Sequence, residues 1–360
     1  MIGITFMRKS DLKKIGYLVL TIIIMLSIGS CSFPKKEAPS ASSAQMTNSE
    51  YVALTEIKGG RPDIYLIVKI IESSYWQVII QGAQDAGEDL GCNIYMGGTA
   101  NETDWPGQKV LIEQALERGA DGIILSPDDS VELAGDIDRI HKQHIPIVLI
   151  DTAANTDSFD ICYMTDNLLA GQNAAEEMLF QLNEMGRSQY EDLTVGILVG
   201  QATSQTINER LAGFIQYWSV NAPDSWEIIT DIKNCNGNID LGEELITDLM
   251  KEHPNLAGLY GTNNGPTRAL AQTISEQGRK DIVVVGFDMS DEIRALIESP
   301  DYHASTMLQR QYDMSYRGVE AILDMLNDEY PSIKFEDTGV ASVNHNTMND
   351  PDIIEVLSHN

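Results

Sequence analysis

Polar side chains that could recognise hydroxyl groups follow the apolar, strand-like runs of this sequence. The run VVVG is followed by Phe287 and Asp288, and the run IVLI is followed by Asp151. A carboxylate can accept hydrogen bonds from two neighbouring hydroxyls, and such charge-assisted bonds are the stronger kind. Asn263 and Gln309 end two further runs, and an amide both donates and accepts, as a hydroxyl does. The pattern therefore indicates a site for a small ligand with several hydroxyls.

The remaining candidates lie at or just after the end of a strand-like run, or at the start of the helix that follows it. They are Lys69, Ser73, Tyr75, Trp76, Ser126, Thr165 and Arg210. The two aromatic rings could cover the apolar C–H face of a sugar ring. No catalytic residue is assigned among them.

Each candidate also has a structural explanation. The two aspartates could be helix N-caps or turn residues, the aromatic pair could belong to the core, and the arginine could lie on a helix surface. Asn263 and Asn264 could form a turn, and Lys69 could pair with Glu72 at the surface. The position that the candidates share, rather than any single residue, favours a site.

Strand-like and helix-like runs alternate from Asp63 onward, and the cycle restarts near residue 193. The strand-like runs are continuously apolar, which is typical of parallel strands covered by helices on both faces. The sequence therefore predicts an α/β protein with two doubly wound parallel-sheet lobes. Ligands of such sheets bind beyond the C-terminal ends of the strands, which is where the candidates lie.

The N-terminus predicts export across the cytoplasmic membrane. Basic residues precede a mainly apolar run, residues 15–28, that is short for a bilayer span and typical of a signal peptide. The run ends in Ile-Gly-Ser-Cys, which resembles a bacterial lipobox with Cys31 as the lipid-modified residue; the alternative is a secretory peptide with an incidental cysteine. We expect a lipoprotein signal peptide over 1–30, a flexible Ser- and Ala-rich tether over 31–60, and an extracytoplasmic protein anchored to the cell membrane.

Charge and cysteine usage exclude several classes. The chain has 360 residues, enough for two domains, and a formal net charge of −30, which disfavours nucleic acid as a partner. Cys92, Cys162 and Cys235 are widely spaced and suggest small buried hydrophobes rather than disulfides. His141 and His144 lack a third ligand, and the Asp-rich segments lack the ordered spacing of a calcium loop. No metal or cofactor is expected.

The chain resembles the type I periplasmic binding proteins, specifically the ribose- and galactose-binding branch, over roughly residues 63–340. The resemblance is carried by VVVGFDMSDE, RLAGF, YGTNNG, the IPIVLID strand with TDN after it, and Ser-Tyr-Trp at the first helix. It implies two lobes joined by a multi-strand hinge, with crossings near Thr165, Gln309 and the tail, and closure around ligand. It assigns 61–165 plus 310–338 to the N-terminal lobe and 166–309 plus 339–360 to the C-terminal lobe.

The resemblance also implies roles for the candidates. It implies that the aromatic pair borders the sugar, that the two aspartates and the arginine bind its oxygens, and that further contacts come from Ser73, Asn263 and Gln309. The chain departs from the family at Ser126, where Asn is frequent, at Thr152, where Arg is frequent, and at Lys69, which replaces a small polar residue. The loop IKNCNGNID also lacks an aromatic that ribose binders carry. These departures put ribose itself in doubt.

The expected function is that of a solute-binding protein, a monomer, that delivers a monosaccharide or similar polyol to the membrane permease of an ABC transporter. The alternative is a sensory lipoprotein that presents a sugar or autoinducer to a membrane histidine kinase or chemoreceptor. A glycosidase would also use two carboxylates, but the same pair is needed to hold hydroxyls. The segment GQATSQT lacks the ending of a phosphate-binding loop. We therefore expect no enzymatic activity.

Overall fold

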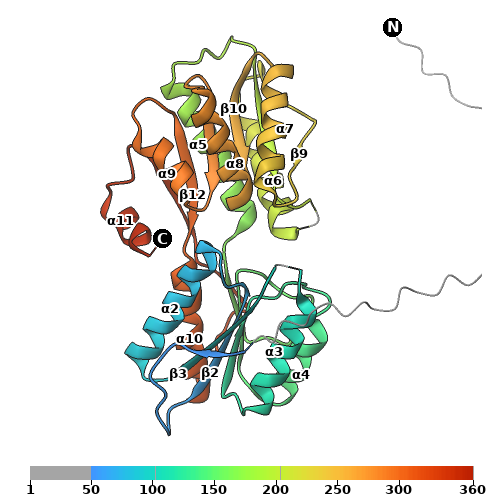
Figure 1. Cartoon of the computed structure of the whole chain (residues 1–360), viewed down its shortest axis with the longest axis vertical. Coiled ribbons are helices and arrows are strands. Elements are labelled where there is room, and N and C mark those ends of the chain that lie inside the picture. The colour runs from blue at the N-terminus through green and yellow to red at the C-terminus, as the bar shows by residue number, and fades with distance from the viewer. Residues whose placement is uncertain (1–49, 102, 203, 360) are drawn as a thin grey trace, which may run out of the picture. The chain divides into compact units, whose positions relative to one another are not determined.

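The fold of the described residues is built on two separate sheets (Figure 1). The computed structural model describes residues 50–359, except 102 and 203. The predicted signal peptide, Cys31 and most of the predicted tether lie outside these residues. The two sheets and their helices are called the first lobe and the second lobe below.

The first sheet is parallel except for its first strand, which runs antiparallel to its neighbour. Its strands, in spatial order, are β1 (Val52–Ala53), β3 (Asn93–Thr99), β2 (Asp63–Ile70), β4 (Gly122–Leu125), β5 (Ile147–Ile150), β6 (Ile161–Met164) and β13 (Phe335–Asp337).

The second sheet follows the same plan, with one antiparallel strand at an edge. Its strands, in spatial order, are β14 (Val340–Asn344), β12 (Ala304–Gln309), β11 (Val283–Phe287), β10 (Leu256–Gly261), β7 (Leu193–Val199) and β8 (Trp226–Ile228). The short strand β9 (Lys233–Asn234) also pairs with β7.

Strand β2 shows why these strands are apolar without a polar gap. Ile64, Leu66 and Val68 belong to the hydrophobic core on one face of the first sheet. The alternate residues Tyr65 and Ile67 belong to the core on the other face. Because successive side chains of a strand point to opposite faces, a strand covered on both sides has to be apolar at every position.

Helices supply these two covers in each lobe. In the first lobe, α2 (Ser74–Leu90) and α10 (Gln311–Leu326) cover one face, and α3 (Trp105–Glu117) and α4 (Ala134–Lys142) cover the other (Figure 1). In the second lobe, α5 (Asn167–Glu184) and α6 (Gln205–Asn221) share one core. The opposite core contains α7 (Ile239–Glu252), α8 (Asn264–Gln277), α9 (Asp291–Glu298) and α11 (Pro351–Ser358). The prediction of an α/β protein with doubly wound sheets is confirmed.

The chain passes between the two sheets three times. It leaves the first sheet after β6, returns to the first lobe after β12, and passes from β13 to β14 near the C-terminus. A hydrogen bond joins two of these crossings, since the hydroxyl of Thr165, after β6, donates to the side-chain oxygen of Gln309, at the end of β12, at 2.9 Å. Both connecting residues are therefore fixed to each other beside the ends of the strands.

The folded part begins earlier than the expected start near Arg61. Val52 and Ala53 form β1, which pairs with β3, and the Tyr51 hydroxyl donates to the Leu111 carbonyl at 2.9 Å. Thr55 is buried, and its hydroxyl oxygen accepts from the Ile94 amide. The prediction of a tether up to residue 60 is thus wrong for residues 50–60, because a two-residue strand has no periodicity that composition could reveal.

Candidate ligand-binding site

A cavity of about 120 Å³ lies where the strand ends of the two lobes meet. Its lining contains most of the predicted site residues: Lys69, Ser73, Tyr75, Trp76, Asp151, Arg210, Asn263, Asp288 and Gln309. This cavity is called the inner cavity below. It brings together residues that are more than two hundred positions apart in the sequence.

The two aspartates occupy equivalent positions with the same unusual backbone. Asp151 directly follows β5 and has φ 63°, and Asp288 directly follows β11 and has φ 64°. Left-handed backbone is uncommon outside glycine, although Asp and Asn tolerate it best, and it is concentrated at functional sites. Neither aspartate is the N-cap of a helix, since the N-cap of α9 is Ser290 and the element that follows Asp151 is strand β6. The N-cap alternative is therefore excluded for both.

Asp151 is held by four donors from the first lobe. The Tyr75 hydroxyl donates to Oδ1 at 2.6 Å. The Lys69 ammonium at 3.2 Å, the Thr152 hydroxyl at 2.6 Å and the Ser126 hydroxyl at 3.3 Å all donate to Oδ2. These contacts fix the orientation of the Asp151 carboxylate in the absence of a ligand.

This environment keeps Asp151 ionised and Tyr75 neutral. Burial raises the pKa of Asp151, but the Lys69 charge and the hydrogen bonds from Thr152, Tyr75 and Lys69 lower it further than burial raises it. Burial, followed by the charges of Asp151 and Asp288, holds the pKa of Tyr75 well above its usual value. Lys69 therefore pairs with Asp151 and not, as one alternative had it, with Glu72 at the surface.

The second carboxylate is oriented from the hinge side. Gln309 Nε2 donates to Asp288 Oδ1 at 2.8 Å, while the Gln309 oxygen accepts from the Thr165 hydroxyl at 2.9 Å. The Thr306 hydroxyl donates to the Asp288 carbonyl at 2.7 Å. A continuous chain of hydrogen bonds thus runs from a crossing segment to the cavity.

Arg210 is buried rather than exposed on its helix, so the surface alternative is wrong. Its Nε donates to the Asn167 side-chain oxygen at 2.8 Å and its Nη1 to the Thr262 carbonyl at 3.0 Å. The guanidinium carbon lies 4.0 Å from the centre of the Phe287 ring, a cation–π contact. The aromatic residue before Asp288 thus supports the cation that shares the cavity with it.

Close helix packing fixes the backbone that carries Arg210. A Cβ atom built on Gly171 of α5 would lie 2.0 Å from the Arg210 carbonyl oxygen. A Cβ atom on Gly213 of α6 would lie 2.0 Å from the Leu168 carbonyl oxygen. Glycine at both positions lets the two helix backbones touch, which sets the position of the arginine relative to the sheet.

Two polar residues at helix starts keep their side chains free of capping bonds. Ser73 and Asn263 are the N-caps of α2 and α8, yet neither side chain makes a capping hydrogen bond. Both line the cavity instead. Trp76 is only 2% exposed and belongs to the core, but it also lines the cavity. Its core and site interpretations are therefore compatible, and Tyr75 packs edge-on against it with ring centres 5.0 Å apart.

Two predicted residues do not line the inner cavity. Ser126 is fully buried behind Asp151, to which it donates, and Thr165 is buried behind Gln309. Neither side chain is part of the lining of the inner cavity, and their direct contact with a ligand stays a prediction. The two side chains orient Asp151 and Gln309, which do line the cavity. The sequence could not show this, because a strand-end position alone does not say whether a side chain faces the cavity.

Sequence reasoning missed five residues of the lining, which are Thr152, Ser204, Thr206, Ile207 and Asn264. Thr152 and Asn264 directly follow chosen strand-end residues, so the same rule extended by one position would have included them. Ser204 and Thr206 lie at the start of α6, upstream of Arg210. Ile207 has no polar group and gave no signal.

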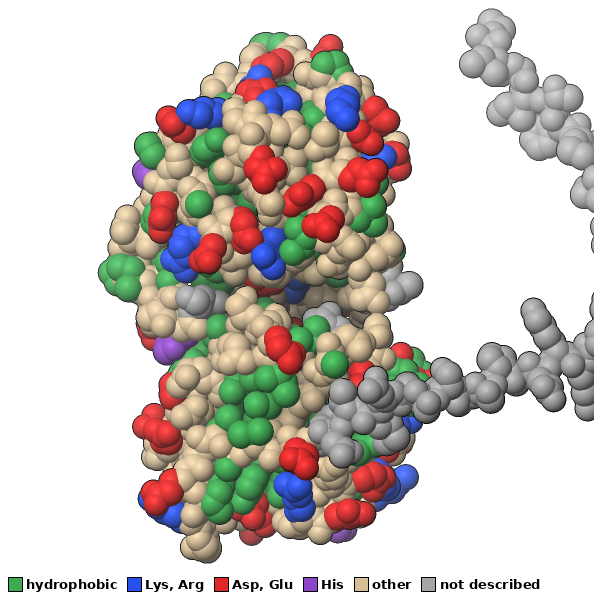
Figure 2. All heavy atoms as spheres, viewed as in Figure 1, with side chains coloured by type: hydrophobic (Ala, Val, Ile, Leu, Met, Phe, Trp, Pro, Cys, Tyr) green, Lys and Arg blue, Asp and Glu red, His purple; other side chains and the backbone are tan. Residues whose placement is uncertain are grey.

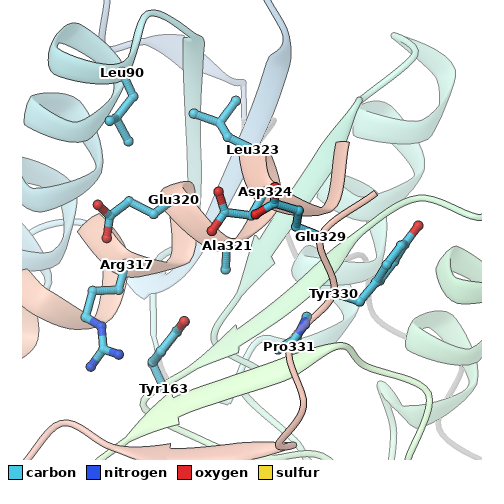
Figure 3. Close-up of a pocket in the computed structure, with 10 residues that line it drawn as sticks. All are labelled: Leu90, Tyr163, Arg317, Glu320, Ala321, Leu323, Asp324, Glu329, Tyr330 and Pro331. Carbon is cyan, nitrogen blue, oxygen red and sulfur yellow. The ribbon is translucent and has the colours of Figure 1, made fainter. Parts of the chain in front are cut away.

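A separate cavity of about 510 Å³ lies on the first lobe (Figure 3). Its residues come chiefly from α10 and the segment after it, including Arg317, Glu320 and Tyr330. Arg317 pairs with Glu336 and lies over the Tyr163 ring. None of the predicted site residues lines this cavity, so it is not the candidate site.

The described residues also bear on the expectations about surface charge, cysteines, metal ligands and membrane-spanning helices. Figure 2 shows Asp and Glu side chains spread over both lobes among Lys and Arg. Cys92, Cys162 and Cys235 are buried and unbonded, as expected. Within residues 50–359, leaving out 102 and 203, no group of three His, Cys, Asp or Glu could hold a metal ion. Over the same residues no helix is long and apolar enough to cross a membrane.

Comparison with known families decides the identity of the fold. A family model described as periplasmic binding protein domain matches residues 64–329, which include most of both lobes and the whole inner cavity. The chain belongs to this family. The resemblance inferred from the strand-end motifs is thereby confirmed, and this periplasmic binding protein is a binding protein rather than an enzyme.

Relatives of this periplasmic binding protein include the D-allose-binding periplasmic protein of Escherichia coli, 22% identical over 72% of the chain and 83% of the relative. A solute-binding protein from Agrobacterium radiobacter, solved with D-arabinose, is 28% identical, with a TM-score of 0.75 over 83% of the chain and 99% of that structure. One from Agrobacterium vitis, solved with D-fucose, is 26% identical, with a TM-score of 0.71 over 81% and 98%.

Proposed function

We propose that the protein captures a monosaccharide, or a similar polyhydroxylated ligand, outside the cytoplasm for uptake by an ABC transporter. One observation carries the proposal. Asp151 and Asp288 leave different sheets in the same left-handed conformation and line one cavity. Lys69 and Arg210 line it too, so two cations offset two carboxylates. A charge-balanced cavity rich in donors and acceptors suits a neutral ligand with many hydroxyls.

The comparisons support a sugar as that ligand. The E. coli relative is named for D-allose, and the two solved structures carry D-arabinose and D-fucose. Import rather than signalling is the proposed use, because two further relatives are named as import binding proteins for D-apiose and ribose. We infer that the partner is the permease of such a transporter.

Lys69 and Thr152, two residues at which the chain departs from the family, contact each other and bear on which sugar is bound. The Lys69 ammonium donates to the Thr152 hydroxyl at 2.8 Å, as well as to Asp151. We infer that Lys69 supplies, from β2, the cation that relatives place directly after the strand-end aspartate. Its charge reaches the cavity from a different direction, which favours a sugar other than ribose.

A panel of sugars tests the proposal on purified full-length protein. D-Allose, D-arabinose, D-fucose, D-galactose, D-xylose and D-ribose would each be added at millimolar concentration and the melting temperature recorded. Binding to the native state alone stabilises it by about 2.7 kcal/mol at a hundredfold excess over Kd, so we expect at least one sugar to raise the melting temperature by several degrees. Calorimetry gives the affinity. If no neutral sugar or polyol shifts the melting temperature, the proposal is wrong.

We also propose that Cys31 anchors the protein to the membrane through a lipid, because it follows basic residues, an apolar core and a small pair in the required order. Cys31→Ser should abolish incorporation of radiolabelled palmitate, since serine offers no thiol for the thioether. Ser32→Ala, one residue away, should incorporate label normally. Label retained in the Cys31 variant would contradict the anchor.

A further inference from the structure

A second chamber of about 500 Å³ adjoins the inner cavity. The two share part of their lining, at Lys69, Thr152, Ser204 and Thr206. These shared residues come from both lobes, so the two spaces are neighbours within the cleft. The second space is called the outer chamber below. A ligand bound at Asp151 and Asp288 could therefore extend into it without leaving the cleft.

The outer chamber is walled by both lobes, as the inner cavity is. Trp105 and Val131 line it from the first lobe, and Gln205 and Glu209 from the second. Trp105 is half-buried and is the first residue of α3. The other lining groups are mainly hydroxyls, amides and carboxylates. Like the inner cavity, the outer chamber thus combines an aromatic ring, which can cover the apolar face of a sugar, with groups that can hydrogen-bond its hydroxyls.

The charge of the outer chamber limits which chemical class of ligand it can bind. Among the described residues that line it, Asp128, Asp129 and Glu209 face one cation, Lys69. This excess of carboxylates disfavours a phosphate or a sugar acid, because like charges repel. It leaves neutral hydroxyl-rich groups as the fitting class.

Size also separates the two spaces. Sites for drug-sized ligands have volumes of about 300–1,000 Å³. The inner cavity, at about 120 Å³, lies below that range and suits one sugar ring, whereas the outer chamber, at about 500 Å³, lies within it. A monosaccharide bound in the inner cavity would leave the larger space to water.

We propose that the outer chamber is a second subsite, which binds a further sugar unit of the same ligand. The ligand is then a neutral disaccharide or glycoside, with one ring in the inner cavity and the next beside Trp105. The proposal rests on the proposed function, since the first ring must bind at the two aspartates.

The experiment compares matched sugars on the purified full-length protein by calorimetry. The probes are D-glucose with maltose and cellobiose, D-galactose with lactose and melibiose, and D-xylose with xylobiose. We expect at least one disaccharide to bind at least about tenfold more tightly than either of its component monosaccharides, the gain that two ordinary additional hydrogen bonds would give.

Two variants place the gain in the outer chamber. Gln205 is exposed and lines only the outer chamber, so Gln205→Trp should fill that space without disturbing the fold. We expect it to remove the advantage of the disaccharide and to leave monosaccharide affinity within about twofold. Gln205→Ala is the size control and should keep the advantage. Val131→Trp, also at an exposed residue, tests the opposite wall.

The outcomes separate the two proposals. Disaccharides that bind no better than bound monosaccharides would overturn the second subsite and leave the proposed function standing. A disaccharide advantage that survives both tryptophan variants, or a parallel loss of monosaccharide binding in both, would also overturn the subsite. If no sugar in either panel binds, the proposed function falls and the subsite falls with it.

Discussion

Asp288→Asn should weaken binding of the best sugar about a hundredfold. Hydrogen bonds to a charged group contribute about 1.5–3 kcal/mol each, and every 1.4 kcal/mol is tenfold in affinity. The carboxylate is buried and lines the inner cavity, so replacing it with an amide removes a charged acceptor from the place where the ligand is proposed to bind. Calorimetry with the best sugar of the panel measures the loss.

The choice of asparagine isolates the charge. Asp288 has φ 64°, and asparagine tolerates left-handed backbone nearly as well as aspartate, whereas alanine would add strain. Asp328→Asn is a matched control, because Asp328 also has a positive φ, 67°, but is exposed and lies outside the cavity. We expect it to bind normally. Unchanged affinity in the Asp288 variant would remove that residue from the site.

Lys69→Met should lower the free energy of unfolding by about 3 kcal/mol at pH 7. Removing one partner of a buried ion pair costs about 3–5 kcal/mol, because the other charge stays buried without compensation. The Lys69 and Asp151 side chains are 15% and 12% exposed, which places the expected cost at the lower end. The midpoint of urea unfolding measures it.

A second substitution tests the cause of that loss. In Lys69→Met with Asp151→Asn, neither charge of this pair is left without its partner, so we expect most of the lost stability to return. Lys280→Met is the control, because its ion pair with Asp301 is more than half exposed on both sides and should contribute little. If the double variant is no more stable than Lys69→Met, lost packing rather than an uncompensated charge explains the effect.

The same pair predicts a pH dependence. The pKa of Asp151 lies below its ordinary value in the folded protein. The group therefore stabilises the fold above the pKa of an unfolded carboxyl, about 3.9, and this contribution is lost as the pH falls through the folded value. Without Lys69, burial raises the pKa and the protonated form is favoured. The stability difference between the native protein and Lys69→Met should thus be smaller at pH 3.5 than at pH 7. An equal difference at both values would contradict the role of the charge.

Local sequence patterns were enough for the fold and for the positions of the two carboxylates. A strand buried on both faces has to be apolar throughout, as β2 is, and such strands alternating with helices leave few architectures. The end of each strand then marks the edge where ligands bind, which selected Asp151 and Asp288 before any coordinates. That these residues contact the ligand stays a prediction.

The composition of the N-terminal part led to a predicted start of the fold that is too late in the sequence. Residues 50–60 look like linker, yet β1 pairs with β3 and Thr55 is buried. The pairing is antiparallel, with a strand forty residues further along, and two residues cannot show a period. Only the contact itself reveals the element.

Sequence alone determined that the protein is made of two covered parallel sheets and which residues stand at their functional edge, because both follow from the alternation of side chains along each strand. Only the tertiary structure decided which way those side chains point. It turned Lys69 toward Asp151 and Thr152 and left Ser126 and Thr165 behind the cavity. It also joined the outer chamber to the inner one. These features depend on distances between segments far apart in the chain, which no local pattern encodes.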